Sequence, residues 1–301
     1  MTLIECIPNF SEGRRLDVVD KLAAAAASVD GVTVLDQQSD ATHNRCVITF
    51  VGDEVAIAEA AFRSIRAASE LIDLNSHQGA HPRFGAADVV PFVPLRAEEM
   101  PLCVEVARGL AKRVAAEIGV PAFLYEDAAL VPEHRDLAVI RKGGFEELRD
   151  VIATDPARQP DEGEPRVHPT AGVVAIGARS PLIAFNVNLD SDDLELAQRI
   201  AREIRERDGG MPSVKAIGLL LDDGAVQVSM NLTDYRTTSM ADVVVAVGER
   251  AAKSGVAIRE SEVIGLLPED ALVQLAKEAL VATGFSREQV LEARVLDTLL
   301  P

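Results

Sequence analysis

The order in which strand-like and helix-like segments follow one another limits the folds open to this chain. Strands alternate apolar and polar residues, whereas helices repeat apolar residues at intervals of three and four. In the first half the order is strand, helix, two strands, helix, strand. These segments span 3–8, 14–29, 32–37, 45–51, 54–70 and 88–93. The order βαββαβ is typical of ferredoxin-like α+β units.

The second half of the chain repeats this order with little sequence identity to the first. Its predicted strands span 182–188, 214–221, 225–231 and 261–267, and its predicted helices span 192–207 and 238–253. Between the halves, 98–150 predicts a helix, a short strand and a further helix that ends near Arg149. The polar, Pro-rich stretch 155–169 is either a linker or a binding loop. We therefore predict an α+β fold with two ferredoxin-like βαββαβ subdomains, whose sheets each bury one face and can pack on one another.

Composition and charge exclude several classes of protein. The chain has 301 residues, of which 48% are apolar and 26% charged, as in a globular protein. A formal net charge of −18 disfavours nucleic-acid binding, which needs clustered basic residues. We expect neither a membrane span nor a signal peptide, and we expect a cytoplasmic location. The three cysteines, Cys6, Cys46 and Cys103, support neither a disulfide framework nor a thiolate metal site.

The loop Asn75–Asp88 (NSHQGAHPRFGAAD) is the strongest candidate for a functional site. It expands the first half at a place where the second half has a shorter connection. His77 and His81 can exchange protons near neutral pH, since histidine has a pKa of about 6.5. Three interpretations stay open, namely general acid/base catalysis by one histidine, a metal site using both, and histidines that merely cap backbone groups. Pro82 argues against the helix that would place both histidines on one face.

Polar residues elsewhere are further candidates. Asn44 and Arg45 stand where a polar turn meets a strand, although a solvent-facing arginine is the plainer interpretation. Asn9 lies between a strand and a helix, where it could bind an anion or only begin the helix. Asn186 alternates with apolar residues along its strand. The loop that begins at Gly163 could present its backbone to a flat ligand or dock the linker onto the second half.

Several long segments together resemble one family. They are IECIPNFSEG (4–13), HNRCVITFVGD (43–53), HQGAHPRFGAADVVPFVP (77–94), FLYEDAA (123–129), IRKGGFEEL (140–148), HPTAGVVAIGAR (168–179), LIAFNVNLD (182–190) and AVQVSMNLTDY (225–235). The chain resembles the glutamate formimidoyltransferases from Leu3 to about Leu280. The resemblance is to the transferase part alone, so we expect the standalone form rather than one fused to a cyclodeaminase domain.

The resemblance implies a fold and a reaction. The fold would have an N-terminal subdomain over 1–178 and a C-terminal one over 179–301, with the sheets facing each other, helices outside, and a tunnel for folate. The reaction would transfer the formimidoyl group of N-formimidoyl-L-glutamate to N5 of tetrahydrofolate, in histidine degradation. The co-substrate would be tetrahydrofolate, mono- or polyglutamylated, and the enzyme a homodimer. No metal is needed, because the amidinium carbon is already electrophilic.

The resemblance also assigns residues. Its catalytic histidine corresponds to His81, which as a general acid and base would move a proton from N5 to the departing glutamate nitrogen. Its folate-contacting stretch corresponds to Gly163, Glu164, Pro165, Arg166, Val167, His168, Pro169, Thr170, Ala171 and Gly172. Residues that we expect to bind substrate are Asn9, Asn44, Arg45, His77, Arg83 and Asn186. Of these, Arg45 and Arg83 would receive the carboxylates of glutamate.

Three positions depart from the family's pattern. Ala80 stands where the family usually has Glu, Phe84 where it has Met, and Glu162 where it often has an aromatic residue. The Ala80 substitution permits a noncatalytic folate-binding protein as an alternative. Another alternative is a formimidoyl- or formyltransferase that uses a different amino acid, such as glycine. A metal hydrolase that uses His77 and His81 is the third.

Overall fold

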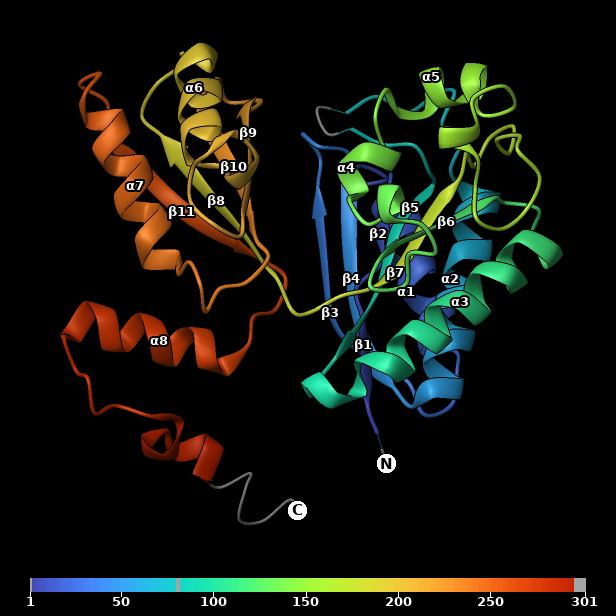
Figure 1. The fold of residues 1–301 in the computed structure, drawn as a ribbon, viewed down its shortest axis with the longest axis horizontal. Helices are drawn as coiled ribbons and strands as arrows, with labels where there is room; N and C mark the ends of the chain where they lie inside the picture. The colour runs from blue at the N-terminus through green and yellow to red at the C-terminus, as the bar shows by residue number, and fades with distance from the viewer. Residues whose placement is uncertain (1, 80–81, 295–301) are drawn as a thin grey trace. The chain divides into compact units, whose positions relative to one another are not determined.

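The chain forms two units, Met1–Ser180 and Pro181–Pro301, in a computed structural model that describes residues 2–79 and 82–294 (Figure 1). Each unit has its own sheet and its own cluster of buried apolar side chains. Over the described residues no helix is both long enough and apolar enough to cross a membrane. The predicted α+β class is confirmed. The ferredoxin-like assignment, the boundary at 178 and the facing of the two sheets stay predictions.

The first unit is built on a seven-stranded sheet. Its elements are β1 (Ile4–Cys6), β2 (Asn9–Phe10), α1 (Leu16–Ala27), β3 (Thr33–Asp40), β4 (Arg45–Gly52), α2 (Glu54–Leu71), β5 (Ala87–Pro94), α3 (Met100–Glu117), β6 (Ala122–Glu126), α4 (Leu137–Ile140), α5 (Gly144–Val151) and β7 (Val174–Ala178). β1 and β2 both pair with β4 and β5, so they act as one strand interrupted at Ile7 and Pro8. The helices α1, α2 and α3 lie on one side of the sheet (Figure 1).

The larger sheet contains a strand that the sequence analysis did not predict. β7 lies between β5 and β6 and runs parallel to both. All five of its residues are buried. A strand buried on both faces shows a continuous apolar run rather than alternation, so its periodicity carries no strand signal. The first unit therefore extends beyond the six elements of the predicted βαββαβ order.

A capping side chain explains where α2 begins. Asp53 accepts hydrogen bonds from the backbone N–H groups of Val55 and Ala56 and so caps α2.

All three cysteines are free and buried in the first unit, as residues of its apolar core. Burial raises the pKa of Cys46 and of Cys103 to about 12, which keeps both thiols protonated and inert.

The second unit has the predicted element order. Its elements are β8 (Ile183–Leu189), α6 (Leu194–Ile204), β9 (Val214–Leu220), β10 (Val226–Leu232), α7 (Met240–Ala252), β11 (Ile258–Ile264) and α8 (Glu269–Leu280). Its four strands pair antiparallel in the order β11–β8–β10–β9. β11 begins three residues earlier than predicted, because a register shift between Ile258 and Glu260 breaks its alternation. The sequence analysis did not predict α8.

Candidate functional site

Two stretches that are about ninety residues apart in the sequence are hydrogen-bonded to each other in the first unit. One is the predicted catalytic loop, Asn75–Asp88, and the other is the predicted folate stretch, 163–172. Two bonds run from the loop, one from Asn75 Nδ2 to Pro169 O and one from Ala86 N to Ala171 O, and a third runs to Thr170 O from Leu74 N, just before the loop; each is 2.9 Å long. The structure thus brings both stretches to the edge of the sheet where β5 and β7 begin.

Glycine is required at the crossing of these two stretches. Gly85 and Gly172 form an isolated antiparallel β-bridge. Gly172 has φ +70°, a left-handed conformation that favours glycine. A Cβ at this position would lie only 2.2 Å from the carbonyl oxygen of Phe84. The backbones therefore approach more closely than any other residue at 172 would allow.

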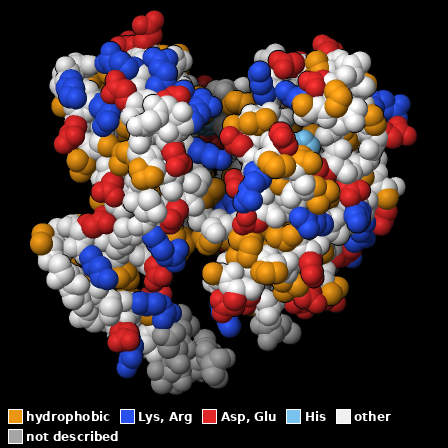
Figure 2. All heavy atoms as spheres, in the orientation of Figure 1, with side chains coloured by type: hydrophobic (Ala, Val, Ile, Leu, Met, Phe, Trp, Pro, Cys, Tyr) orange, Lys and Arg blue, Asp and Glu red, His pale blue; other side chains and the backbone are white. Residues whose placement is uncertain are grey.

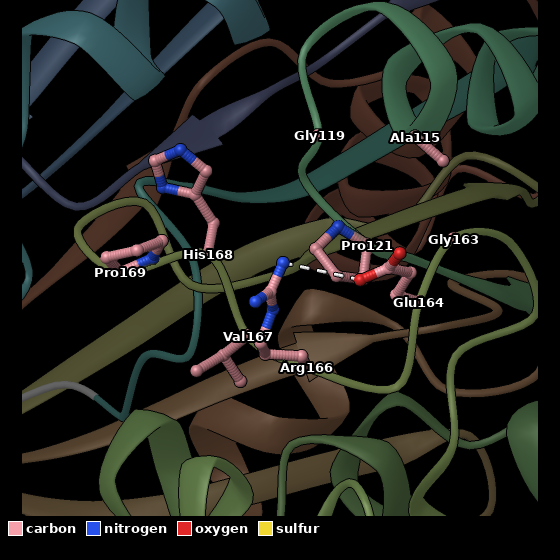
Figure 3. A pocket seen from close by; sticks show the side chains of 9 residues that line it. All are labelled: Ala115, Gly119, Pro121, Gly163, Glu164, Arg166, Val167, His168 and Pro169. Atoms are coloured by element: carbon pink, nitrogen blue, oxygen red, sulfur yellow. Dashed lines mark hydrogen bonds and ion pairs between the residues drawn. The ribbon is translucent and has the colours of Figure 1, made fainter.

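The predicted folate stretch lines a cavity of about 310 Å³. Figure 3 shows its lining: Ala115, Gly119, Pro121, Gly163, Glu164, Arg166, Val167, His168 and Pro169. Arg166 and Glu164, both exposed, form an ion pair 3.3 Å long. Ligand pockets typically measure about 300–1,000 Å³, so this cavity lies at the lower end of that range. Glu162, just before the stretch, forms a backbone bridge with Ala122.

His168 is fixed by the backbone of its own turn. Its Nδ1 accepts a hydrogen bond from the N–H of Ala171 at 3.0 Å. Burial lowers the pKa of His168, which favours the neutral ring that can accept at Nδ1. In Figure 3 its imidazole points away from the Arg166–Glu164 pair. His168 therefore shapes the loop and presents its other ring nitrogen, Nε2, as the donor.

His77 is held in place through both of its ring nitrogens. Nδ1 accepts from Arg83 Nε at 3.3 Å, so Nε2 carries the hydrogen and donates to Asn44 O at 2.9 Å. Burial lowers the pKa of His77, which is consistent with a neutral ring. With both nitrogens occupied, His77 braces the loop. His81, the predicted catalytic residue, and its neighbour Ala80 lie outside the described residues.

Arg83, a predicted receiver of substrate carboxylate, already binds a carboxylate of the chain. Its two terminal nitrogens donate to the two oxygens of Glu146, each at 2.7 Å. This hydrogen bonding lowers the pKa of Glu146. The carbonyl of Arg83 also accepts from Phe145 N at 3.1 Å. A substrate carboxylate would have to displace Glu146 to reach this guanidinium.

Asn44, Asn9 and Arg45, all predicted from the sequence, come together beside the loop. Asn44 Oδ1 accepts from Gly13 N at 3.0 Å, and its Nδ2 donates to Gln78 O at 2.9 Å. Asn44 thereby ties the turn after β2 to the loop. Asn9 Oδ1 accepts from Arg45 Nε at 3.2 Å, which directs the Arg45 guanidinium toward the start of β5.

Asp88, the last residue of the loop, is completely buried and joins two arginines. Arg45 Nη1 and Arg141 Nη2 contact its Oδ2 at 2.8 Å and 3.0 Å. Its Oδ1 accepts from Phe84 N at 2.8 Å and from Gly85 N at 3.2 Å. Burial alone would raise the pKa of Asp88, but Arg141 and Arg45 hold it at about 2. Asp88 is therefore ionised and fixes the loop to both guanidinium groups.

The sequence analysis did not single out Arg141 or Glu146. Both lie in the segment IRKGGFEEL, whose two glycines have φ +74° and +65°. This pair lets the chain turn sharply between α4 and α5, so that Arg141 and Glu146 both return to the loop. The two adjacent glycines are the sequence signal that could have indicated a turn bringing these two residues to the loop. Phe84 packs in the core below, with its ring centroid 5.9 Å from Arg141 Cζ.

Asn186, the remaining predicted site residue, belongs to the second unit. It lies on β8, and its Nδ2 donates to Glu262 on β11 at 3.4 Å.

Within the described ranges, no group of three or more His, Cys, Asp or Glu side chains is placed to hold a metal ion. On the face of each unit seen in Figure 2, acidic and basic side chains are interspersed.

Comparison with known proteins connects this geometry to a family. Two family models match the chain, the formiminotransferase domain, N-terminal subdomain, over residues 3–179 and the formiminotransferase domain over residues 184–285. The chain belongs to the formiminotransferase domain family. The resemblance inferred from the sequence is thereby confirmed, and the family makes the chain an enzyme of the formimidoyltransferase class.

Relatives in this family include full-length matches. A glutamate formimidoyltransferase of Streptococcus pyogenes serotype M1 is 47% identical over 296 residues, which cover 98% of this chain and 99% of the relative. One from Thermoplasma acidophilum is 48% identical over 298 residues, with 98% of each chain covered. A formimidoyltransferase-cyclodeaminase of Sus scrofa is 39% identical over 91% of this chain and 52% of its own length.

Proposed function

We propose that this chain is a glutamate formimidoyltransferase, which transfers the formimidoyl group of N-formimidoyl-L-glutamate to N5 of tetrahydrofolate. The name of its full-length bacterial and archaeal relatives supports this activity. The observation that carries the proposal to particular residues is the hydrogen-bonded junction of the loop 75–88 with the stretch 163–172. That junction would place a folate held by one stretch beside a proton-transferring group on the other.

In the proposed reaction N5 attacks the amidine carbon and forms a tetrahedral intermediate. His81 accepts the proton that N5 loses and donates it to the glutamate nitrogen as the carbon–nitrogen bond to glutamate breaks. The products are 5-formimidoyltetrahydrofolate and L-glutamate. His77 is unsuited to this role, because both of its ring nitrogens are engaged within the loop. We assign the folate-binding role to 163–172.

An assay of the purified protein with tetrahydrofolate and N-formimidoyl-L-glutamate tests this function, with the folate product followed by its absorbance. We expect His81→Ala to lower kcat by about a hundredfold or more while folate binding is retained, because a general acid and base typically contributes this much. Folate binding is measured by calorimetry, and far-UV circular dichroism controls for folding. The control variant is Arg166→Ala, expected to weaken folate binding rather than the chemical step.

Other outcomes would replace the proposal. Unchanged turnover in His81→Ala would remove His81 from the reaction. Folate binding by the wild type without turnover would favour a noncatalytic binding protein, and turnover only with an N-formimidoylglycine donor would change the substrate. Loss of activity on chelation, restored by zinc, would favour metal-dependent chemistry. We also propose a cytoplasmic homodimer, and light scattering on the eluted protein measures the dimer's mass.

A further inference from the structure

The start of the stretch 163–172 is held by a buried histidine–aspartate pair. His134 lies in the 3₁₀ turn Pro132–His134 after β6, and Asp161 lies two residues before Gly163. His134 Nδ1 lies 2.8 Å from Asp161 Oδ2, and the two side chains are 7% and 5% exposed. Because a carboxylate oxygen only accepts, Nδ1 carries the hydrogen and donates it. The pair therefore joins the turn after β6 to the segment that leads into the stretch.

Further hydrogen bonds fix Asp161 against β6. Its Oδ2 also accepts from Leu124 N at 2.7 Å. The N–H groups of Asp161 and Glu162 donate to Ala122 O at 3.0 Å and 3.1 Å, and Ala122 N donates to Glu162 O at 2.9 Å. Burial of a carboxylate is costly unless it is hydrogen-bonded, so the side chain of Asp161 is stable only where both of its donors meet it. This requirement defines where the chain enters the stretch.

The anchored segment forms one wall of the cavity. Pro121 and Gly163 both line the cavity, and each is next to a residue of the backbone pairing just described (Figure 3). Gly163 has φ +97°, and an added Cβ would lie 3.2 Å from Pro121 Cα and 3.3 Å from Ala115 Cβ. The chain therefore passes closely between Pro121 and Ala115. A shift of Asp161 would move Gly163 against these two residues.

The stretch has a second anchor further along. The four residues 163–166 are all exposed. After them, the backbone of His168 exchanges hydrogen bonds of 2.8 Å and 3.1 Å with Gly172. An exposed segment between two anchors is preorganised for a ligand when both of its ends are fixed. The His134–Asp161 pair supplies the anchor at the N-terminal end.

The imidazole of His134 also contacts an aromatic pair that reaches the loop 75–88. It packs edge-on against Phe123, with the ring centroids 5.4 Å apart, and Phe123 stacks on Phe84 at 6.1 Å. His134 thus makes one polar contact, with Asp161, and one aromatic contact. A phenylalanine in its place would keep the ring against Phe123 and lose the hydrogen bond, so the two contacts can be tested separately.

We propose that His134 and Asp161 are positioning residues for folate, and that the pair preorganises the stretch 163–172 in the conformation that receives tetrahydrofolate. This inference rests on the proposed function, which assigns folate to that stretch. The pair acts through the backbone of 161–163, so neither side chain has to touch the folate. Without the pair, binding has to order the segment itself, which weakens folate binding and leaves the chemical step on the loop 75–88 unchanged.

Steady-state kinetics of Asp161→Ala and His134→Phe test the pair. In each variant we expect the KM for tetrahydrofolate to rise about three- to tenfold, because binding then includes the cost of ordering the segment. The kcat and the KM for N-formimidoyl-L-glutamate should change less than about twofold, since no contact made in the transition state is removed. A purely structural pair would instead lower the amount of folded enzyme, and hence the apparent kcat, with both KM values unchanged. That result overturns the inference.

A conservative variant and an exposed carboxylate are the controls. In Asp161→Asn the amide oxygen can accept from both Leu124 N and His134 Nδ1, so its KM for tetrahydrofolate should stay within about threefold of the wild type. An Asp161→Asn variant as impaired as Asp161→Ala overturns the inference. Asp127→Ala is the matched control, because Asp127 pairs with Arg135 at 2.9 Å and these side chains are 40% and 62% exposed. We expect it to leave both KM values unchanged.

A double variant tests whether the two residues act as one unit. If they act through their mutual hydrogen bond, Asp161→Ala/His134→Phe raises the KM for tetrahydrofolate no further than either single variant does. Effects that multiply in the double variant would show two independent residues and overturn the pair.

Calorimetry with tetrahydrofolate separates this inference from the proposed function, because it needs no turnover. We expect the dissociation constant to rise in Asp161→Ala and His134→Phe by the same factor as the KM. Folate binding by a wild type without turnover contradicts the proposed transferase activity and leaves the pair to be judged by the binding data. Equal folate affinity in the wild type and Asp161→Ala, both folded by far-UV circular dichroism, overturns the inference alone.

Discussion

At the scale of single residues, Asp88 shows how one buried carboxylate fixes a functional loop. It accepts two backbone N–H groups of the loop and contacts two arginines from β4 and from the segment after α4. These four contacts of the carboxylate are polar, so its position depends on matched charges and hydrogen bonds. Such a set is strongly disturbed when one member is removed.

Asp88→Asn should therefore lower the free energy of unfolding by about 3–5 kcal/mol at pH 7, because it removes the buried carboxylate that both guanidinium groups contact. The pKa of Asp88 is held at about 2, below the value of about 3.9 for an unfolded chain. The stabilisation is complete above about pH 4 and is lost as the pH falls toward 2. Urea unfolding from pH 7 to 2.5 should show the gap between variant and wild type shrinking by about 2 kcal/mol.

An exposed carboxylate provides the control for this prediction. Asp17 is 70% exposed and pairs with Lys21. Asp17→Asn should change the free energy of unfolding by less than about 0.5 kcal/mol at either pH. If the Asp88→Asn gap is the same at pH 7 and pH 2.5, the arginines do not hold Asp88 ionised.

At the scale of elements, the site depends on backbone crossings that only glycine permits. Gly172→Ala should lower the free energy of unfolding by at least about 1–2 kcal/mol, because φ +70° is unfavourable for alanine and its Cβ would strike Phe84 O. Gly109 lies within α3, and a Cβ added there would meet no atom within 4 Å beyond its chain neighbours and the nearby backbone of its own helix. Gly109→Ala should instead raise stability by about 0.5–1 kcal/mol. Urea denaturation of both variants measures whether each substitution lowers or raises the free energy of unfolding. Equal effects of the two substitutions would contradict the requirement for glycine at position 172.

At the scale of the whole molecule, the two units have separate cores, and the chain carries a natural reporter for one of them. Cys6, Cys46 and Cys103 are the chain's only cysteines, and all are buried in the first unit. In urea, thiol labelling should follow unfolding of the first unit alone, whereas far-UV circular dichroism follows both. We expect the two transitions not to coincide, since cooperative units with separate cores can unfold independently. Coincident transitions would mean that the units unfold as one.

Local pattern was sufficient for most elements of the chain. The helices α1, α2, α6 and α7 lie within a few residues of their predicted bounds, because their apolar stripes, and in α2, α6 and α7 also their capping residues, are encoded in adjacent sequence. The local pattern did not predict β7, because a strand that is buried throughout shows no alternation of apolar and polar residues. It also predicted the start of β11 at the wrong residue, because the pairing register shifts within that strand. At the candidate site, the sequence analysis singled out Asn44, Arg45 and both loops, which stay predictions, and it did not single out Arg141 or Glu146.

The sequence by itself determined the α+β class, the element order of the second unit and the family, since periodicity and ordered motifs are local properties of the chain. Only the tertiary structure decided which segments meet. In the folded chain, hydrogen bonds connect 75–88 to 163–172. Arg83 forms an ion pair with Glu146, and Arg45 and Arg141 both form ion pairs with Asp88. Charge pairing acts through space over a few ångströms, and that distance is set by the folded sheet and the glycine turns rather than by spacing along the chain.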